Sequence, residues 1–179
     1  MFLLDAIDQT IRKLKAQTAN ILTLLNLSLG GFAIISVMNN QLNLSLLLIF
    51  LAALADRFDG MVARRFNIES ELGKQLDSMC DIISFGVAPA LLIYQGILVE
   101  FGAPGAAFTI LYIACGALRL ARFNISENNG YFTGVPITVA GCIATLSFLA
   151  YPYVTPVFFA FLMIILSILM ISPLRLKKM

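Results

Sequence analysis

Four aspartates in the sequence form two pairs, each on one face of a helix. Asp56 and Asp59 lie three residues apart, and Asp77 and Asp81 lie four apart, which are the separations of neighbours on a helix surface. Two antiparallel helices joined by a short connector would direct both pairs into one cavity. Four carboxylates there repel one another unless cations lie between them. Because oxygen ligands favour hard cations, the pattern predicts a site for two divalent ions of Mg²⁺, Mn²⁺ or Ca²⁺.

The residues around these aspartates indicate a site for a diphosphate. Gly60 and Gly73 share the two helix faces and allow a bulky ligand to approach the backbone. Arg64 lies one turn after Gly60, and its planar guanidinium group suits phosphate. Carboxylate-bound metal ions commonly act beside substrate phosphates, where they promote displacement at phosphorus. The chain contains no His, so any general base must be another side chain, such as a carboxylate.

This arrangement is similar to the signature of the CDP-alcohol phosphotransferase family. Between residues 56 and 81 the sequence has the family's residue at every signature position, and the likeness extends over essentially the whole chain. It implies a six-helix membrane enzyme, usually a homodimer, whose site opens to the cytoplasm. It also implies that the four aspartates bind two ions of Mg²⁺ or Mn²⁺, and that Asp81 is the general base as well. The implied contacts of the CDP group are Gly60, Ala63, Arg64 and Gly73.

Within the family, the chain most resembles the small membrane-embedded phosphatidylserine synthases. The likeness rests on SFGVAP at 84–89, RLARFN at 119–124, GVP at 134–136 and NILTLLN at 20–26. It implies transfer of the phosphatidyl group from CDP-diacylglycerol to L-serine, with phosphatidylserine and CMP as products. The further substrate contacts that it implies are Asn20, Thr23, Asn26, Arg119, Arg122 and Asn124.

Several alternatives stay open. Arg119 and Arg122 suit the lipid phosphate or the serine carboxylate, but both also fit basic anchors at a helix end. Glycerol 3-phosphate or inositol 3-phosphate would replace serine only with further basic residues in the pocket. The donor is either a diacylglycerol or an archaeal ether lipid. An ion transporter with an intramembrane carboxylate relay belongs to a different class, and it leaves the spacing of Gly60, Arg64 and Gly73 unexplained.

The elements that must hold these residues are apolar helices. The chain has 179 residues, 60% of them hydrophobic and 12% charged, against roughly 45–50% and about 25% in soluble domains. Most of the six apolar stretches come near the ~20 residues of a membrane crossing. We therefore predict an all-α integral membrane protein with one domain over 1–179 and a six-helix bundle over 20–179. The predicted crossings are 21–38, 44–63, 73–97, 104–122, 134–153 and 155–171.

The charged residues indicate how the helices are oriented. With six crossings, all 12 Lys and Arg residues fall on the side of the two termini, and the opposite connectors carry Glu100 instead. The positive-inside tendency then places the termini and the acidic site on the cytoplasmic side of the cell membrane. Residues 1–19 combine apolar and charged side chains at helical spacing, which predicts an amphipathic helix in the cytoplasmic interface.

Other conspicuous residues are expected to serve packing. Cys80, Cys115 and Cys142 lie in apolar stretches without paired spacing, so we expect inert buried thiols. The Gly30–Gly31 pair is expected to let helices approach one another, and Tyr112 to pack or to anchor its helix. We expect membrane lipids and the substrates as partners, and no nucleic acid.

Overall fold

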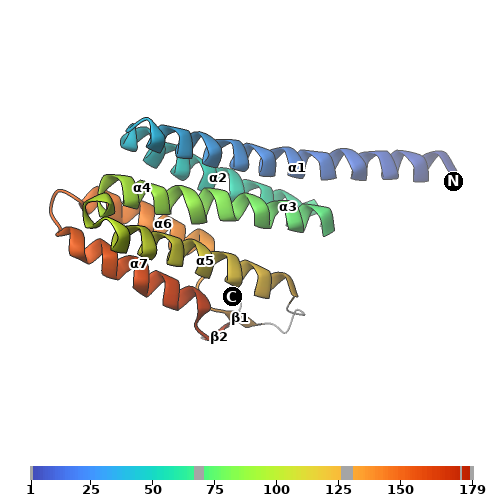
Figure 1. Cartoon of the computed structure of the whole chain (residues 1–179). Helices are drawn as coiled ribbons and strands as arrows, with labels where there is room; N and C mark the ends of the chain where they lie inside the picture. Colours follow the sequence, from blue (N-terminus) through green and yellow to red (C-terminus); the bar gives the residue numbers. More distant parts are fainter. Residues whose placement is uncertain (1, 67–70, 126–130, 174, 178–179) are drawn as a thin grey trace.

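The computed structural model describes residues 2–66, 71–125, 131–173 and 175–177, with the side chains of 20–61, 71–125 and 134–173. Nearly all of the described chain is helical, and Figure 1 shows the helices side by side in one elongated bundle. In chain order the helices are α1 (Phe2–Met38), α2 (Leu42–Phe66), α3 (Glu71–Asp81), the π-helix η1 (Ile82–Val87), α4 (Ala88–Gly96), the 3₁₀-helix η2 (Leu98–Phe101), α5 (Ala103–Ile125), α6 (Ile137–Ser147), the 3₁₀-helix η3 (Phe148–Ala150) and α7 (Pro156–Ile171).

Two short strands are an exception to the predicted all-α fold. The strands β1 (Tyr131–Thr133) and β2 (Arg175–Lys177) pair in antiparallel orientation, with Phe132 opposite Leu176. Each strand has 3 residues, too few for an alternating pattern to be visible in the sequence. The pair joins the segment before α6 to the segment after α7, at the end of the bundle where α5 and α7 terminate (Figure 1).

The N-terminal helix differs from the prediction. The sequence predicts a separate interfacial helix over 1–19, whereas α1 continues without a break into the first apolar stretch. No Gly or Pro precedes Gly30 in the sequence, so nothing interrupts the helical hydrogen bonding. Its 37 residues span about 55 Å, well beyond the ~30 Å thickness of a bilayer's hydrocarbon core. In Figure 1 its first part extends past the other helices.

The lengths of the other helices suit a membrane protein. Within the described residues, Asn20–Met38, Glu71–Gly96 and Ala103–Ile125 are long and apolar enough to cross a membrane. The stretches Ile137–Ala150 and Pro156–Ile171 are shorter apolar helices. The 25 residues of α2 include charged residues in the second half of the helix. Each predicted crossing therefore corresponds to helical structure, although length and composition alone qualify only three of them.

Large apolar side chains cover much of the outside of the bundle. Phe32, Phe161 and Ile168 are 61%, 61% and 62% exposed, and soluble proteins rarely expose apolar surface so extensively. Small residues lie inside and permit close helix packing. The buried alanines include Ala33, Ala52, Ala88, Ala140 and Ala144.

The packing predictions are confirmed in most respects. All three cysteines are free, with Cys80 and Cys115 buried and Cys142 half-buried. A side chain at Gly30 would collide with Ser84 of η1, whereas one at Gly31 would meet nothing within 4 Å. Of the two glycines, Gly30 is therefore the one that allows close packing.

Candidate active site

Carboxylates from α2 and α3 meet at one point between these helices. Asp56, Asp59 and Asp77 each present a carboxylate oxygen, and these oxygens lie within 4.8 Å of one another. The arrangement follows from the chain path, because α2 ends and α3 begins at the same end of the bundle (Figure 1). Asp59 is buried, while Asp56 and Asp77 are half-buried. Three carboxylates at this separation can hold a divalent ion.

Asp81 adds a fourth carboxylate one turn further along α3. Its side chain is within hydrogen-bonding reach of Asp56, and the negative charges of Asp56, Asp77 and Asp59 all act on it. Asp81 is 8% exposed, and its Oδ1 has no hydrogen-bond partner among the described residues. Carboxyl groups in such contact require a shared proton or a cation between them. The structure thus brings together all four aspartates that the sequence singles out.

Helix α1 contributes polar residues along its face toward α2 and η1. The Thr23 hydroxyl donates a hydrogen bond of 2.8 Å to Oδ2 of Asp59. One turn later, the backbone carbonyl of Asn26 accepts a hydrogen bond of 3.1 Å from the Ser84 hydroxyl. The Asn26 side chain is fully buried, and neither amide atom has a partner among the described residues. Asn20 lies one turn before Thr23 and is half-buried.

The two arginines of α5 have different surroundings. Arg119 is 8% exposed, and its Nε has no hydrogen-bond partner within the described part of the chain. Its guanidinium carbon lies 5.7 Å from the centroid of the Phe123 ring, and it interacts electrostatically with Asp81. Arg122 is exposed and donates from Nη1 to the carbonyl of Ile171, at 3.4 Å, where α7 ends. Only Arg119 is buried near the acidic group.

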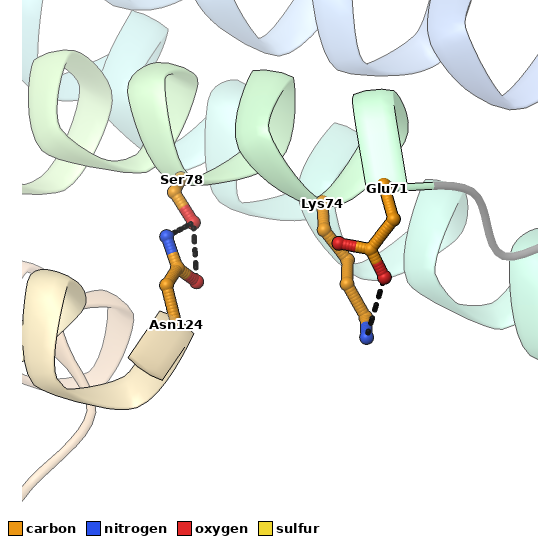
Figure 2. A network of polar contacts seen from close by, with 4 residues as sticks. All are labelled: Glu71, Lys74, Ser78 and Asn124. Carbon is orange, nitrogen blue, oxygen red and sulfur yellow. Dashed lines mark hydrogen bonds and ion pairs between the residues drawn. The ribbon is translucent and has the colours of Figure 1, made fainter. Parts of the chain in front are cut away.

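Asn124 binds α3 at the end of α5. Its amide nitrogen donates to the Ser78 hydroxyl at 3.1 Å, and that hydroxyl donates to the amide oxygen at 3.2 Å. Figure 2 shows this pair beside the ion pair of Lys74 with Glu71, whose charged atoms lie 3.9 Å apart. Because Ser78 follows Asp77 directly, Asn124 connects α5 to the helix that carries two of the aspartates.

The glycines proposed to contact CDP occupy the same helices as the aspartates. Gly60 is half-buried and follows Asp59 in α2, and Gly73 is half-buried one turn before Asp77 in α3. Ala63 and Arg64 lie in the last turns of α2, but their side chains are outside the described part of the structure. The glycines therefore lie close to the acidic group, as their spacing predicts.

The pattern of apolar residues gives no indication of the π-helix η1, which begins directly after Asp81. Helices of this type are rare and frequently occur at functional sites. Tyr112 is buried, as expected of a packing residue, but its hydroxyl also donates to the carbonyl of Phe85 in η1 at 3.1 Å. Pro89 was the available signal, because a proline in a helix removes a backbone donor.

The four aspartates thus form an acidic centre within a bundle of apolar helices. Residues 16–173 match the CDP-alcohol phosphatidyltransferase family, and the chain belongs to this family of transferases. Family membership excludes the ion-transporter alternative, whose only support was the presence of charged residues in the helices.

Several curated proteins of the family are similar to this chain. The archaetidylserine synthase of Methanothermobacter thermautotrophicus is 42% identical over 157 residues, which are 86% of this chain and 66% of the relative. The CDP-diacylglycerol–serine O-phosphatidyltransferase of Bacillus subtilis is 40% identical over 129 residues, 71% of this chain and 73% of the relative. The enzyme of the same name from Helicobacter pylori strain 26695 is 35% identical over 165 residues, 87% and 70% of the two chains. This chain therefore spans between 66% and 73% of the length of these relatives.

Proposed function

We propose that this enzyme transfers the phosphatidyl group of CDP-diacylglycerol to the hydroxyl of L-serine, forming phosphatidylserine and releasing CMP. The observation that carries the proposal is the convergence of four aspartates beside the buried Arg119. Relatives with the activity of a serine O-phosphatidyltransferase support serine as the acceptor. The archaetidylserine synthase among the relatives makes an ether-lipid donor the second candidate.

The residues of the acidic centre fit two divalent ions, Mg²⁺ or Mn²⁺, held by Asp56, Asp59, Asp77 and Asp81. The four aspartates offer carboxylate oxygens, which hard cations prefer, and the unpartnered Oδ1 of the buried Asp81 is suited to a cation or to a donated proton. Bound ions would neutralise the diphosphate and stabilise the departing CMP. Thr23 orients Asp59 through its 2.8 Å hydrogen bond, which restricts the directions from which this carboxylate can bind an ion.

Asp81 is the proposed general base. The serine hydroxyl oxygen attacks the phosphorus atom that carries the diacylglycerol, and the bond from this phosphorus to the CMP oxygen breaks. The hydroxyl proton passes to Asp81, whose Oδ1 has no other hydrogen bond to a described residue. The buried position of Asp81 keeps bulk water away from the proton acceptor.

Arg119 is the proposed partner of the serine carboxylate. Its Nε is unpartnered within the described chain, and a buried guanidinium group of this kind gains from a bidentate anion. The hydrogen bond of Arg122 to the end of α7 supports the anchoring alternative for that residue. The proposed contacts of the nucleotide and the lipid headgroup are Gly60, Ala63, Arg64 and Gly73 on α2 and α3, Asn20, Thr23 and Asn26 on α1, and Asn124 on α5.

The proposed membrane arrangement has six crossings within a single domain, with the site and both termini facing the cytoplasm. Figure 1 shows that one end of the bundle holds the starts of α1, α3 and β2. The same end holds the last turns of α2 and α5. The basic residues of these segments would then lie on one side of the membrane, as the positive-inside tendency requires. We expect the working enzyme to be a homodimer, as the family resemblance implies.

Product analysis with defined substrates tests the proposal. Purified protein would receive CDP-diacylglycerol or its archaeal ether analogue with Mg²⁺, together with serine, glycerol 3-phosphate or inositol 3-phosphate. Mass spectrometry of the lipid products should detect the serine lipid and, in equal amount, CMP. Formation of only a glycerol phosphate or inositol phosphate lipid would replace serine as the acceptor. CMP release without any lipid product would refute the transfer reaction.

A further inference from the structure

The helix that carries Asp77 and Asp81 changes its winding immediately after Asp81. Residues Ile82–Val87 form the π-helix η1, and Ala88–Gly96 continue as α4. In an α-helix the carbonyl of Phe85 would accept a hydrogen bond from the backbone N–H of residue 89. That residue is Pro89, which has no N–H and whose ring crowds the carbonyl four residues earlier. The sequence therefore both removes the donor for Phe85 and favours a wider turn.

Tyr112 supplies the donor that Pro89 lacks. Its hydroxyl, on α5, donates to the Phe85 carbonyl at 3.1 Å, and the side chain is fully buried in the core. Helix α6 also packs closely against this carbonyl, since a Cβ at Gly141 would lie 2.6 Å from the same oxygen. The Phe85 carbonyl is thus enclosed by two neighbouring helices, and only the tyrosine offers it a side-chain hydrogen bond among the described residues.

A second contact holds the same turn from α1. The Ser84 hydroxyl donates to the backbone carbonyl of Asn26 at 3.1 Å, and Gly30 leaves the space that Ser84 occupies. Because α1 also carries Thr23, the partner of Asp59, the turn is fixed relative to the acidic site. Helices α1, α5 and α6 therefore all contact η1 at Ser84 or Phe85.

The wide turn determines which way the aspartates point. Each residue of an α-helix advances about 100° around its axis, so one additional residue in a turn rotates everything before it by that angle. Beyond η1, Leu92 and Ile93 of α4 face the core. Before it, Asp77 faces Asp56 and Asp59 of α2. If η1 relaxed to α-helical winding while α4 stayed packed, Asp77 and Asp81 would rotate away from α2.

We infer that Tyr112 is a positioning residue for the metal-binding aspartates, because its hydroxyl bond to Phe85 maintains the π turn that directs Asp77 and Asp81 toward α2. The inference rests on the proposed function in one respect, since it takes these aspartates to be metal ligands. Tyr112 touches neither metal nor substrate in this scheme. Its effect passes through the backbone of η1.

The first test uses the Tyr112→Phe variant, which lacks only the hydroxyl group. The probe is Mn²⁺ alone, titrated into the purified full chain without substrates, with free Mn²⁺ measured by electron paramagnetic resonance. We expect the Kd for Mn²⁺ to rise about 2- to 10-fold, the range of one neutral hydrogen bond, and kcat to fall while the KM for serine stays unchanged. Tyr94→Phe on α4 is the matched control and should behave as wild type, since the Tyr94 hydroxyl bonds no other described residue. Unchanged Mn²⁺ affinity in Tyr112→Phe would overturn the inference.

A second variant separates positioning from general stability. Adding Pro89→Ala to Tyr112→Phe gives the Phe85 carbonyl a backbone donor and permits α-helical winding. We expect the melting temperature to recover toward wild type while Mn²⁺ affinity stays low. Recovery of both together would show that Tyr112 serves stability alone. Failure of the proposed function would give a different result. In that case the wild-type protein would bind no Mn²⁺, or the Asp77→Asn variant would bind Mn²⁺ as well as the wild type does.

Discussion

Thr23→Val tests whether the hydrogen bond from α1 prepares Asp59 for metal binding. The substitution removes the hydroxyl that donates to Oδ2 of Asp59 at 2.8 Å and retains the branched shape of the side chain. Both residues are 5% exposed, so water has little access to replace the lost donor. The carboxylate would keep its position in the backbone but lose the contact that sets its orientation.

The structure allows the size of this effect to be anticipated. A hydrogen bond to a charged group contributes about 1.5–3 kcal/mol, which corresponds to roughly 10- to 150-fold in an equilibrium constant. Loss of a residue that orients a metal ligand typically weakens metal binding by about 10- to 100-fold. We therefore expect the Mg²⁺ concentration for half-maximal activity to rise by about 10- to 100-fold, while saturating Mg²⁺ restores most of kcat.

The assay is a Mg²⁺ titration of serine lipid formation in detergent micelles. Thr145→Val is the matched control, because the Thr145 hydroxyl is also buried but donates to Gly141 of its own helix at 2.8 Å. The control should retain the wild-type Mg²⁺ requirement. A Thr23→Val enzyme within twofold of that requirement would refute the role of Thr23, and an equal shift in both variants would assign the effect to packing.

Four further predictions concern the acidic site, the acceptor, the packing of η1 and the topology. Asp56→Asn or Asp77→Asn should abolish turnover in a protein that still inserts into the membrane. EDTA should abolish wild-type turnover until Mg²⁺ is restored. Substantial activity in either variant would contradict the two-ion site. Arg119→Lys should raise the KM for serine about tenfold, because the bidentate contact is lost. Arg122→Lys is the control and should keep the wild-type KM. An equal KM in the two variants would return Arg119 to an anchoring role. Gly141→Ala places a methyl group against the Phe85 backbone and should destabilise the fold by about 1–3 kcal/mol, measured as a lower melting temperature, whereas Gly31→Ala should not. A cysteine at Glu100 should react with impermeant reagents only from the face opposite the cytoplasm, and labelling from the cytoplasmic face would contradict six crossings.

Much of the fold and of the acidic centre follows from local sequence. Apolar stretches near the length of a membrane crossing predict helices wherever they occur, since the bilayer leaves the backbone no other partner for its polar groups. The three- and four-residue spacings place each aspartate pair on one helix face whatever the tertiary arrangement. The family signature adds the fixed spacing between the two pairs, and the structure brings all four carboxylates together.

Other features depend on how the helices pack. The amphipathic segment 1–19 and the first apolar stretch differ in composition, but no residue between them breaks the helix, so α1 is continuous. Arg119 and Arg122 are equivalent candidates in the sequence, yet packing buries the first near Asp81 and leaves the second at the end of α7. Packing of α5 against α3 also lets Asn124 donate a hydrogen bond to Ser78.

The sequence by itself determined the apolar helices and the placing of each aspartate pair on one helix face, because both depend on residue types and on short-range spacing. The tertiary structure decided how Asp77 and Asp81 are oriented relative to α2. Pro89 marks where the helix must deviate, but the side-chain donor for the buried carbonyl of Phe85 is Tyr112, 27 residues after Phe85 in the chain. Gly141 and Gly30 admit the neighbouring helices from still more distant segments. Contacts between residues so far apart have no periodic signature, and they become visible only when the helices are packed together.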